Sequence, residues 1–248
     1  MRKVLTCTLV LMLLTTIALA ENLKYDGNTS DFLADEARVE YAQSLYNGLR
    51  MGELLEYARG YADTVQPPES DSVWSVLEIL EAEADAINAM CAETDDFDGA
   101  YSFTFPNVDA ISDSHHIVPF YNDDDWLMTQ LGFTADDWIY FDEVAISADG
   151  DLVWEYDFDY EDVLRDVLRD PAVMVKESTN ILYDAIDSDT TRAICDSERA
   201  MIRFRSNEKD RQIVFELTAE EKSALDYQHR IGGLRSKLSK LFWDYAHR

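Results

Sequence analysis

The chain has 248 residues, of which 50 are acidic and 21 are basic, so its formal net charge is −29 at pH 7. A protein this acidic is repelled by the phosphate backbone of DNA and RNA, so nucleic acid is excluded as the expected partner. Hydrophobic residues make up 47% of the chain, enough to bury a sizeable core in one large domain or two small ones.

Residues 1–20 are predicted to be a secretory signal peptide. Arg2 and Lys3 precede an uncharged apolar run that ends in Ala-Leu-Ala at Ala20. This layout is typical of a cleavable signal, and the run is short for a membrane helix, which needs about 20 residues. We expect cleavage near Ala20–Glu21 and a mature protein in the periplasm or outside the cell. An uncleaved N-terminal anchor is the alternative.

Two cysteines, Cys91 and Cys195, remain after the predicted cleavage. An even pair in an oxidising compartment favours a disulfide. The bond would close a loop of about 105 residues and stabilise the fold by roughly 4–5 kcal/mol. The alternative is two separate buried thiols, because Cys91 also lies on the apolar stripe of a predicted helix.

The acidic residues are concentrated in the first part of the mature chain. Residues 21–191 contain 7 basic and 41 acidic residues, whereas residues 192–248 contain 12 basic and 9 acidic residues. The chain contains 31 Asp but only 19 Glu and 7 Lys. This composition favours the interpretation that the surface is adapted to high salt. The other interpretation is an acidic surface that binds a basic protein.

Two helices are predicted in the region 21–98. The first runs from Asp31 to Ala62, and a Pro-Pro turn separates it from the second, which runs from Ser72 to about Ala92. The apolar residues of the second helix are spaced alternately four and three apart: Val73, Leu77, Leu80, Ala84, Ile87 and Cys91. We expect these helices to form an antiparallel helical hairpin.

Short strands and turns follow in the region 99–248. Residues 101–105 and 117–121 are predicted to be strands, and residues 123–133 a short helix that stops at a glycine. Asp149-Gly150 separates two apolar runs, the pattern of a β-hairpin, and the carboxyl group of Asp159 is placed to cap a helix after the second strand. Seven of the eighteen residues from Ser147 to Leu164 are acidic, and turn chemistry, strand alternation and helix capping explain most of them.

A second hairpin followed by a helix is predicted near the C-terminus. Residues 200–206 and 211–217 form the two strands, and Thr218 with Glu221 forms a capping box that begins a helix running to the end of the chain. Between the hairpins we expect a helix from Asp170-Pro171 to about Ile186 and a short helix that carries Cys195.

Together these elements predict an α+β fold. Long amphipathic helices lie at both ends of the chain, and between them lie two β-hairpins, each followed by a helix. We expect the helical region 21–98 and the α+β region 99–248 to form one continuous domain. The two hairpin–helix units are similar enough to raise the question of a duplication, which the sequence leaves open.

The sequence lacks the usual catalytic and phosphate-binding motifs. None of its nine glycines forms G-x-G-x-x-G, a P-loop or a G-x-S-x-G elbow. The EF-hand pattern fails around both Gly99 and Gly150, because the closing acidic residue is replaced by Phe105 and Tyr156. We therefore expect no cofactor, although the many carboxylates keep calcium-stabilised structure as a hypothesis.

The best candidate for a catalytic or metal site is the stretch that contains His115, His116 and Asp123–Asp125. Histidine and aspartate can ligate a metal ion or transfer protons in hydrolysis. The adjacent histidines point apart in any regular element, however, so a polar loop is the favoured interpretation.

The last helix carries a basic face, with Arg230, Arg235, Lys237 and Lys240. An amphipathic basic helix can bind an anionic membrane, but here we expect its charges to be solvated or paired with the acidic remainder of the chain. The sequence thus favours an exported, non-enzymatic binding protein with a basic protein partner. The alternatives are a metal-assisted hydrolase and a calcium-stabilised structural protein.

Overall fold

The computed structural model describes residues 31–48, 50–65, 71–89, 91–94, 101–104, 114–121, 127–168 and 174–247. It mixes helices with antiparallel sheets, which confirms the α+β class. The chain divides into two compact units. Unit 1 comprises residues 1–84 and 234–248, and unit 2 comprises residues 85–233.

Unit 1 is helical. It contains the 3₁₀ turn η1 (Phe32–Ala34), the helices α2 (Glu36–Asn47), α3 (Met51–Ala62) and α4 (Ser72–Glu81), and the second half of α7 (Ala219–Ala246). The single helix predicted from Asp31 to Ala62 is therefore wrong. Gly48 ends α2, with its N–H bonded to the carbonyl of Ser44, because glycine has low helix propensity and suits a helix end.

Apolar residues from all four helices of unit 1 are buried, including Leu45, Leu54, Val76 and Leu238. Within this unit the second half of α7 contacts α2. The Tyr46 hydroxyl of α2 donates to the carbonyl of Arg235 in α7 at 3.3 Å, and the Tyr46 ring meets Phe242 edge-on at 5.9 Å.

The predicted helix from Ser72 to Ala92 is also interrupted. After α4, residues Ala84–Ala89 form the short helix α5, and Cys91 lies in strand β1 (Cys91–Thr94), which pairs with β2 (Tyr101–Thr104). The helix prediction relied on apolar spacing alone, and the pairing with β2 overrides that local pattern.

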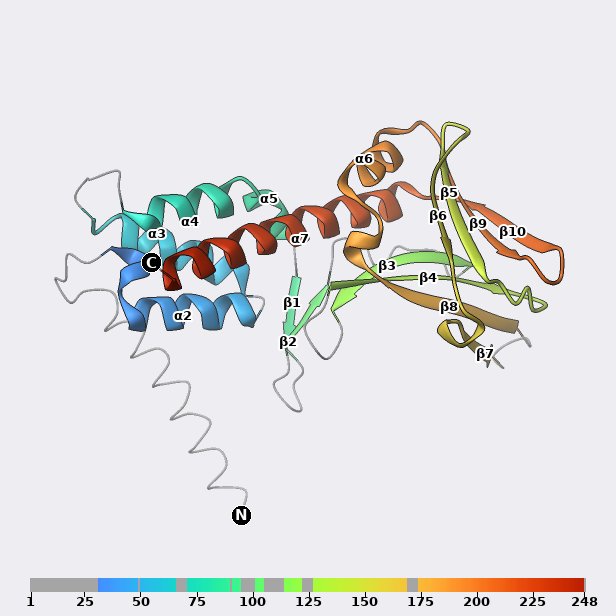
Figure 1. Ribbon diagram of the computed structural model, residues 1–248, viewed down its shortest axis with the longest axis horizontal. Helices are drawn as coiled ribbons and strands as arrows, with labels where there is room; N and C mark the ends of the chain where they lie inside the picture. Colours follow the sequence, from blue (N-terminus) through green and yellow to red (C-terminus); the bar gives the residue numbers. More distant parts are fainter. Residues whose placement is uncertain are drawn as a thin grey trace, which may run out of the picture. The chain divides into compact units, whose positions relative to one another are not determined.

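Unit 2 is a sandwich of two four-stranded antiparallel sheets whose strands run across one another (Figure 1). One sheet has the order β10 (Arg211–Glu216), β9 (Ala200–Ser206), β5 (Glu143–Ala148) and β6 (Asp151–Asp157). The other has the order β3 (His115–Tyr121), β4 (Leu127–Ala135), β8 (Met174–Leu182) and β7 (Leu164–Leu168). The unit also contains most of α5, the strand pair β1–β2, the turns η3 (Tyr160–Asp162) and η4 (Tyr183–Ala185), helix α6 (Ser188–Asp196) and the first half of α7.

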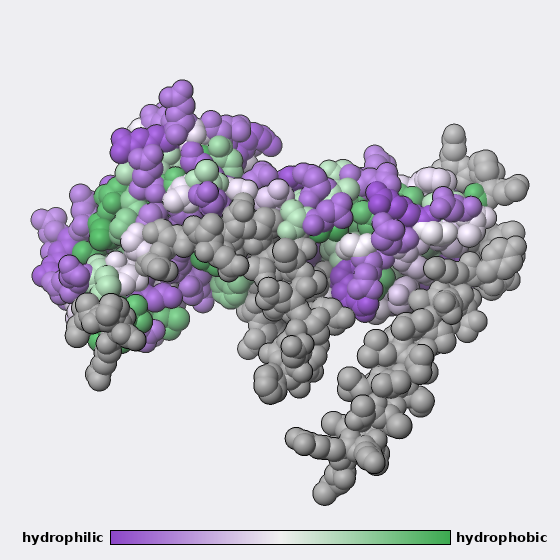
Figure 2. Space-filling model, turned by 180° about the vertical axis from the view of Figure 1, so that it is seen from behind, coloured by the Kyte–Doolittle hydropathy of each residue, from purple (hydrophilic) through white to green (hydrophobic). Residues whose placement is uncertain are grey.

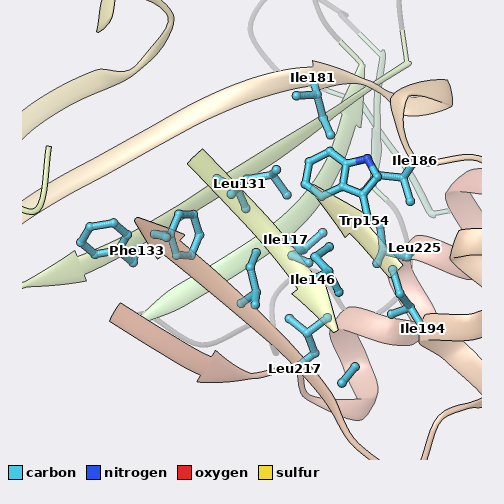
Figure 3. Packing of buried hydrophobic residues seen from close by; sticks show 14 of the residues in the cluster. Ile117, Leu131, Phe133, Ile146, Trp154, Ile181, Ile186, Ile194, Leu217 and Leu225 are labelled. Atoms are coloured by element: carbon cyan, nitrogen blue, oxygen red, sulfur yellow. The ribbon is translucent and has the colours of Figure 1, made fainter. Parts of the chain in front are cut away.

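The inner faces of the two sheets form one hydrophobic core. Figure 3 shows Ile117 of β3 and Ile146 of β5 meeting between the sheets, and Trp154 of β6 lying beside Ile181 of β8. The indole N–H of Trp154 donates to the carbonyl of Ala185 at 2.8 Å, so this large side chain is buried without an unpaired donor. Ile194, Leu217 and Leu225 extend the core toward α6 and α7 (Figure 3).

The first predicted hairpin is confirmed. Strands β5 and β6 meet at Asp149 and Gly150, which both have positive φ, of 52° and 96°. The Asp149 carboxylate also accepts the backbone N–H of Arg199 at 2.9 Å. Asp149 therefore serves the turn, as the sequence predicts, and additionally fixes the start of β9.

The predicted alternation along β6 holds only in part. Trp154 and Phe158 are buried, but Leu152 is 60% exposed. The register of β5 and β6 shifts between Ile146 and Ser147. An extra residue in one strand reverses the side on which the following side chains lie, so the bulge turns Leu152 away from the core.

The helix predicted after the first hairpin is wrong. Asp159 and Asp162 do form the expected cap, since the Asp159 N–H donates to Asp162 at 3.1 Å. The cap starts only the short turn η3, and the chain then enters strand β7, which pairs with β8. A partner strand supplies more hydrogen bonds than an isolated helical turn, so tertiary pairing overrides the cap.

Two further predicted helices are strands. Residues 127–135 form β4, and residues 174–182 form β8 in place of the helix expected up to Ile186. The inward positions of β8 include Glu177 and Thr179, which are buried although they are polar. These polar residues interrupt the apolar alternation that identifies a strand, which explains why the period of two was missed.

The second hairpin and its helix are confirmed. β9 and β10 pair over their full lengths, and α7 begins after Thr218. The Thr218 hydroxyl accepts the N–H of Glu221 at 3.1 Å, and the Glu221 carboxylate accepts the N–H of Thr218 at 2.8 Å. The short helix expected to carry Cys195 is α6.

A buried carboxylate fixes the loop that leads into β5. Glu177 of β8 is fully buried, and its oxygens accept the N–H groups of Ile139, Tyr140 and Phe141 at 2.6–3.1 Å. Tyr140 takes a positive φ of 59°, which lets three successive N–H groups converge on one carboxylate. The guanidinium of Arg165 lies 3.5 Å away and balances the charge.

We predict that Glu177→Gln lowers the free energy of unfolding by about 2–3 kcal/mol, because an amide cannot accept all three bonds and leaves a buried donor unpaired. Urea unfolding followed by tryptophan fluorescence measures this loss. Glu216→Gln is the control, since the exposed Glu216–Arg199 pair at 3.1 Å contributes less than about 1 kcal/mol. Equal losses for the two variants would contradict the structural role of Glu177.

Candidate functional site

His115 lies buried at the edge of β3 and has partners at both ring nitrogens. Its Nε2 lies 3.0 Å from the carbonyl oxygen of Glu216 and 3.3 Å from a carboxylate oxygen of Glu221, and its Nδ1 lies 3.1 Å from the Ser114 hydroxyl. The ring stacks on Phe215 at 4.5 Å. These contacts join β3 to β10, so His115 has a structural role.

Glu221 is completely buried and completes this junction. One of its oxygens accepts the N–H of Ile117 at 3.2 Å, and the other accepts the N–H of Thr218 and approaches His115. A single carboxylate thereby caps α7 and occupies a backbone donor of β3. The sequence identified Glu221 as a capping residue, but its contact with β3 required the tertiary structure.

His116 lies on the opposite face of the same strand, as adjacent residues of a strand must. It packs against Gly132 of β4, where an added Cβ would lie 2.7 Å from its Nε2. Burial, together with the positive charge of Lys176, lowers the pKa of His116 to about 4. His116 is therefore neutral at pH 7 and does not act jointly with His115.

Asp123–Asp125 lie outside the described residues, so the proposed convergence of these aspartates with His115 and His116 stays a hypothesis. Within the described ranges, no group of three or more His, Cys, Asp or Glu side chains is placed to hold a metal ion.

An open pocket of about 760 Å³ lies where α6, β10 and α7 meet in unit 2, lined by Cys195, Glu198, Glu216, Leu217, Thr218, Ala219, Lys222, Ser223 and Asp226. Burial, followed by the negative charges of Asp226 and Asp196, raises the pKa of the Cys195 thiol to about 11. The Lys222 ammonium group is held by the carbonyl oxygen of Ser197 at 2.8 Å. A thiol with so high a pKa is a poor nucleophile at neutral pH.

Cys195 carries a free thiol in the structure, and its Sγ donates to the carbonyl of Lys222 at 3.2 Å. The side chain of Cys91 lies outside the described part. The disulfide between Cys91 and Cys195 is therefore not observed and stays a prediction.

The segment Asp151–Leu168 combines exposed carboxylates with exposed large apolar side chains. We call it the acidic edge. It comprises β6, η3 and β7, and so includes the edge strand of each sheet on one side of the sandwich. All seven of its carboxylates are exposed: Asp151, Glu155, Asp157, Asp159, Glu161, Asp162 and Asp166. Six large apolar side chains are exposed among them: Leu152, Tyr156, Tyr160, Leu164, Val167 and Leu168.

The exposed apolar residues of the acidic edge were missed in the sequence. A helix over this segment would have turned Val163, Leu164, Val167 and Leu168 inward, but only Val163 is buried. Figure 2 shows apolar and polar residues side by side on one face of the sandwich unit. The sequence could not identify the exposed side chains of Leu164, Val167 and Leu168, because that stretch was predicted to be a helix and is a strand.

The one basic residue of the acidic edge is committed to internal contacts. The Arg165 guanidinium donates to the carbonyls of Tyr160 at 2.8 Å and Val163 at 3.0 Å, lies 4.1 Å from the Tyr160 ring centre, and pairs with Glu177. Arg203 of β9 lies 3.6 Å from Glu155 and pairs with the buried Glu143 at 2.8 Å. The remaining carboxylates of the edge keep its surface strongly negative.

The basic face of α7 divides between paired and exposed side chains. Arg230 forms ion pairs with Asp85 and Asp226, and Arg235 lies over the Tyr46 ring at 5.2 Å, while Lys237 and Lys240 are exposed. Among the described helices, none combines the length and the apolar character needed to cross a membrane.

We predict that the folded protein loses stability as the pH falls from about 6.5 to about 4, and that His116 causes part of this loss. An unfolded histidine titrates near pH 6.5 whereas folded His116 titrates near 4, so the unfolded chain takes up the proton first. The contribution is at most about 3 kcal/mol. Urea unfolding at pH 7 and pH 4.5 should show a smaller difference for His116→Leu than for the unchanged protein, and identical differences would refute the assignment.

We also predict that Cys195 is slow to alkylate. At pH 8 a thiol with a pKa near 11 has roughly two orders of magnitude less thiolate than a free cysteine. After reduction, iodoacetamide should therefore label Cys195 slowly in buffer and rapidly in urea, as peptide mass spectrometry would record. The unreduced chain, alkylated in urea, reports the disulfide directly: a bond with Cys91 leaves both cysteines unlabelled.

Comparison with known proteins gives no relative from which a role could be transferred: the chain matches no protein-family model, no curated protein and no solved structure. Its function must be argued from its own surfaces.

Proposed function

We propose that the mature chain is an exported acidic protein, secreted or periplasmic, that binds a basic protein partner and is not an enzyme. The observation that carries this proposal is the acidic edge, a segment of 18 residues with seven exposed carboxylates and six exposed large apolar side chains.

The charge of the acidic edge favours a cationic partner. The segment has seven acidic residues and one basic residue, and that arginine is held by internal contacts. Carboxylates crowded on one edge create a negative potential that attracts a basic protein and speeds its association at low salt.

The apolar side chains favour a binding role over adaptation to salt alone. A surface adapted only to salt needs carboxylates, whereas here Leu152, Tyr160 and Leu164 are each more than half exposed beside them. Exposed apolar groups rimmed by polar residues are typical of protein-binding surfaces, and tyrosine is enriched there. Charge would guide the partner to the edge, and burial of these side chains would hold it.

The hydrolase and calcium hypotheses have weaker support. The Nε2 atom of His115 already contacts the carboxylate of Glu221 and the carbonyl oxygen of Glu216. His116 faces the other side of the strand, so the two histidines do not form one site. The acids of the acidic edge already serve in a turn, on a strand and in a cap, so a calcium ion is not needed to explain them.

The test compares two variants of equal charge, made in the chain from Glu21 onward. The edge variant carries Asp151→Asn, Asp157→Asn, Glu161→Gln and Asp166→Asn. The control variant removes four exposed carboxylates from unit 1: Glu36→Gln, Glu40→Gln, Asp63→Asn and Glu78→Gln. None of these eight side chains makes a hydrogen bond or ion pair within the described ranges, so neither variant should lose its fold.

Immobilised protein is exposed to the envelope and secreted fractions of the host, and captured proteins are quantified by mass spectrometry. We expect basic proteins whose capture falls at least tenfold with the edge variant, stays within twofold with the control variant, and weakens with added salt. If both variants capture the same proteins equally, the acidic edge is not a binding surface and adaptation to salt is the better explanation.

A further inference from the structure

We infer that strand β7 receives an extended segment of the partner, carrying both basic and apolar residues, as an added strand of the sheet. This inference rests on the proposed function and specifies the place and the mode of binding.

The first support is the position of β7 at the end of its sheet. It pairs with β8 alone, from Leu164 opposite Ser178 to Leu168 opposite Met174, and no other described strand lies on its far side. An edge strand offers a row of backbone N–H and C=O groups, and an extended peptide can satisfy them by pairing.

The second support is that hydrogen bonds fix the start of β7 in the absence of a partner. Arg165 joins it to the carbonyls of Tyr160 and Val163, and the Thr179 hydroxyl of β8 donates to the carbonyl of Asp162 at 2.9 Å, just before the strand begins. A fixed strand loses little conformational entropy when a peptide binds to it, which improves affinity.

The third support is the side chains that a bound peptide would meet. Leu164, Val167 and Leu168 are 40–56% exposed, and Asp166 is also exposed. Because side chains alternate along a strand, Leu164, Asp166 and Leu168 share one face of β7 and Val167 lies on the other. Asp159, Glu161 and Asp162 precede the strand. A peptide whose apolar residues cover the leucines and valine and whose lysines or arginines reach the carboxylates would match this surface.

The edge strands on the other side of the sandwich, β3 and β10, have fewer free backbone groups with which an added strand could pair. At β3 the N–H of Ile117 is taken by Glu221, and at β10 the carbonyl of Glu216 is taken by His115. β6 is the remaining edge, but its bulge opposite Ile146 and Ser147 disturbs the regular row of groups that a peptide needs. β7 is therefore the favoured edge.

A second copy of this chain is a poor occupant. Two acidic edges facing each other would bring together fourteen carboxylates, seven from each, and like charges opposite one another destabilise strand pairing. Charge on an edge strand commonly prevents self-association, and the same charge selects a basic occupant.

The probe for this inference is a synthetic peptide of eight alternating lysines and valines, acetylated, amidated and fluorescently labelled. Binding to the chain from Glu21 onward is measured by fluorescence anisotropy, and protected amides are located by hydrogen exchange. We expect saturable binding with new protection in β7. Replacing alternate valines of the peptide with proline keeps its charge but removes strand donors, and should weaken binding at least tenfold. Replacing the lysines with glutamates should abolish it.

Two charge-matched variants locate the strand. Val167→Lys places a positive charge on β7. Val214→Lys does the same on β10, an edge strand on the other side of the sandwich, where the Val214 side chain is 45% exposed. We expect Val167→Lys to weaken binding at least tenfold and Val214→Lys to weaken it less than twofold.

The outcomes separate the two proposals. No saturable binding, equal binding of the proline peptide, or protection on β10 or β6 in place of β7 would overturn strand addition. If the edge variant still loses its captured proteins in any of those cases, the binding function stands and the partner docks by another mode. If the peptide binds the edge variant and the control variant equally, strand addition at the acidic edge is overturned. If the two variants also capture the same proteins equally, the acidic edge fails as the binding surface and both proposals fall.

Discussion

Two buried glutamates, Glu177 and Glu221, hold the sandwich of unit 2 together at points where its sheets meet other elements. Both are completely buried. Glu177 accepts three backbone N–H groups from a segment distant in the sequence, and Glu221 accepts one from the distant Ile117 and one from the nearby Thr218. A buried carboxylate is destabilising unless hydrogen bonds and a positive charge compensate its lost hydration. Glu177 gains this compensation from the loop before β5 and from Arg165. Glu221 accepts N–H groups at the start of α7 and in β3 and lies 3.3 Å from the ring of His115.

These two contacts make the sides of the sandwich unequal. On the side of β3 and β10, Glu221 and His115 occupy backbone groups and bring strand and helix together. On the side of β6 and β7, Glu177 and Arg165 stabilise the strands from within and leave the outer surface to exposed carboxylates and apolar residues. The side of β6 and β7 therefore leaves its outer surface exposed, as the proposed binding role requires.

The sequence predicted hairpins and caps well, because those features depend on a few adjacent residues. Asp149-Gly150 specified the turn, and Thr218 with Glu221 specified the start of α7. It failed at β4 and β8, whose pairing joins residues far apart in the chain, and at β7, which pairs with the next strand, β8. Glu177 is buried in β8, and this polar residue interrupts the apolar alternation by which the strand could be recognised. The cap at Asp159 suggested a helix, but it begins only the single turn η3. His115 and His116 were correctly expected to point apart, but the structural contacts of His115 could not be foreseen.

The sequence by itself determined the charge of the protein, the class of its fold, its turns and its helix caps, since each is set by composition or by neighbours in the chain. Only the tertiary structure decided which carboxylates are buried and which leucines are exposed, because burial depends on which strands become neighbours. The same residues of the acidic edge would have packed inward on a helix. As an edge strand they face solvent, and that change of partner turns an ordinary acidic stretch into a candidate binding surface.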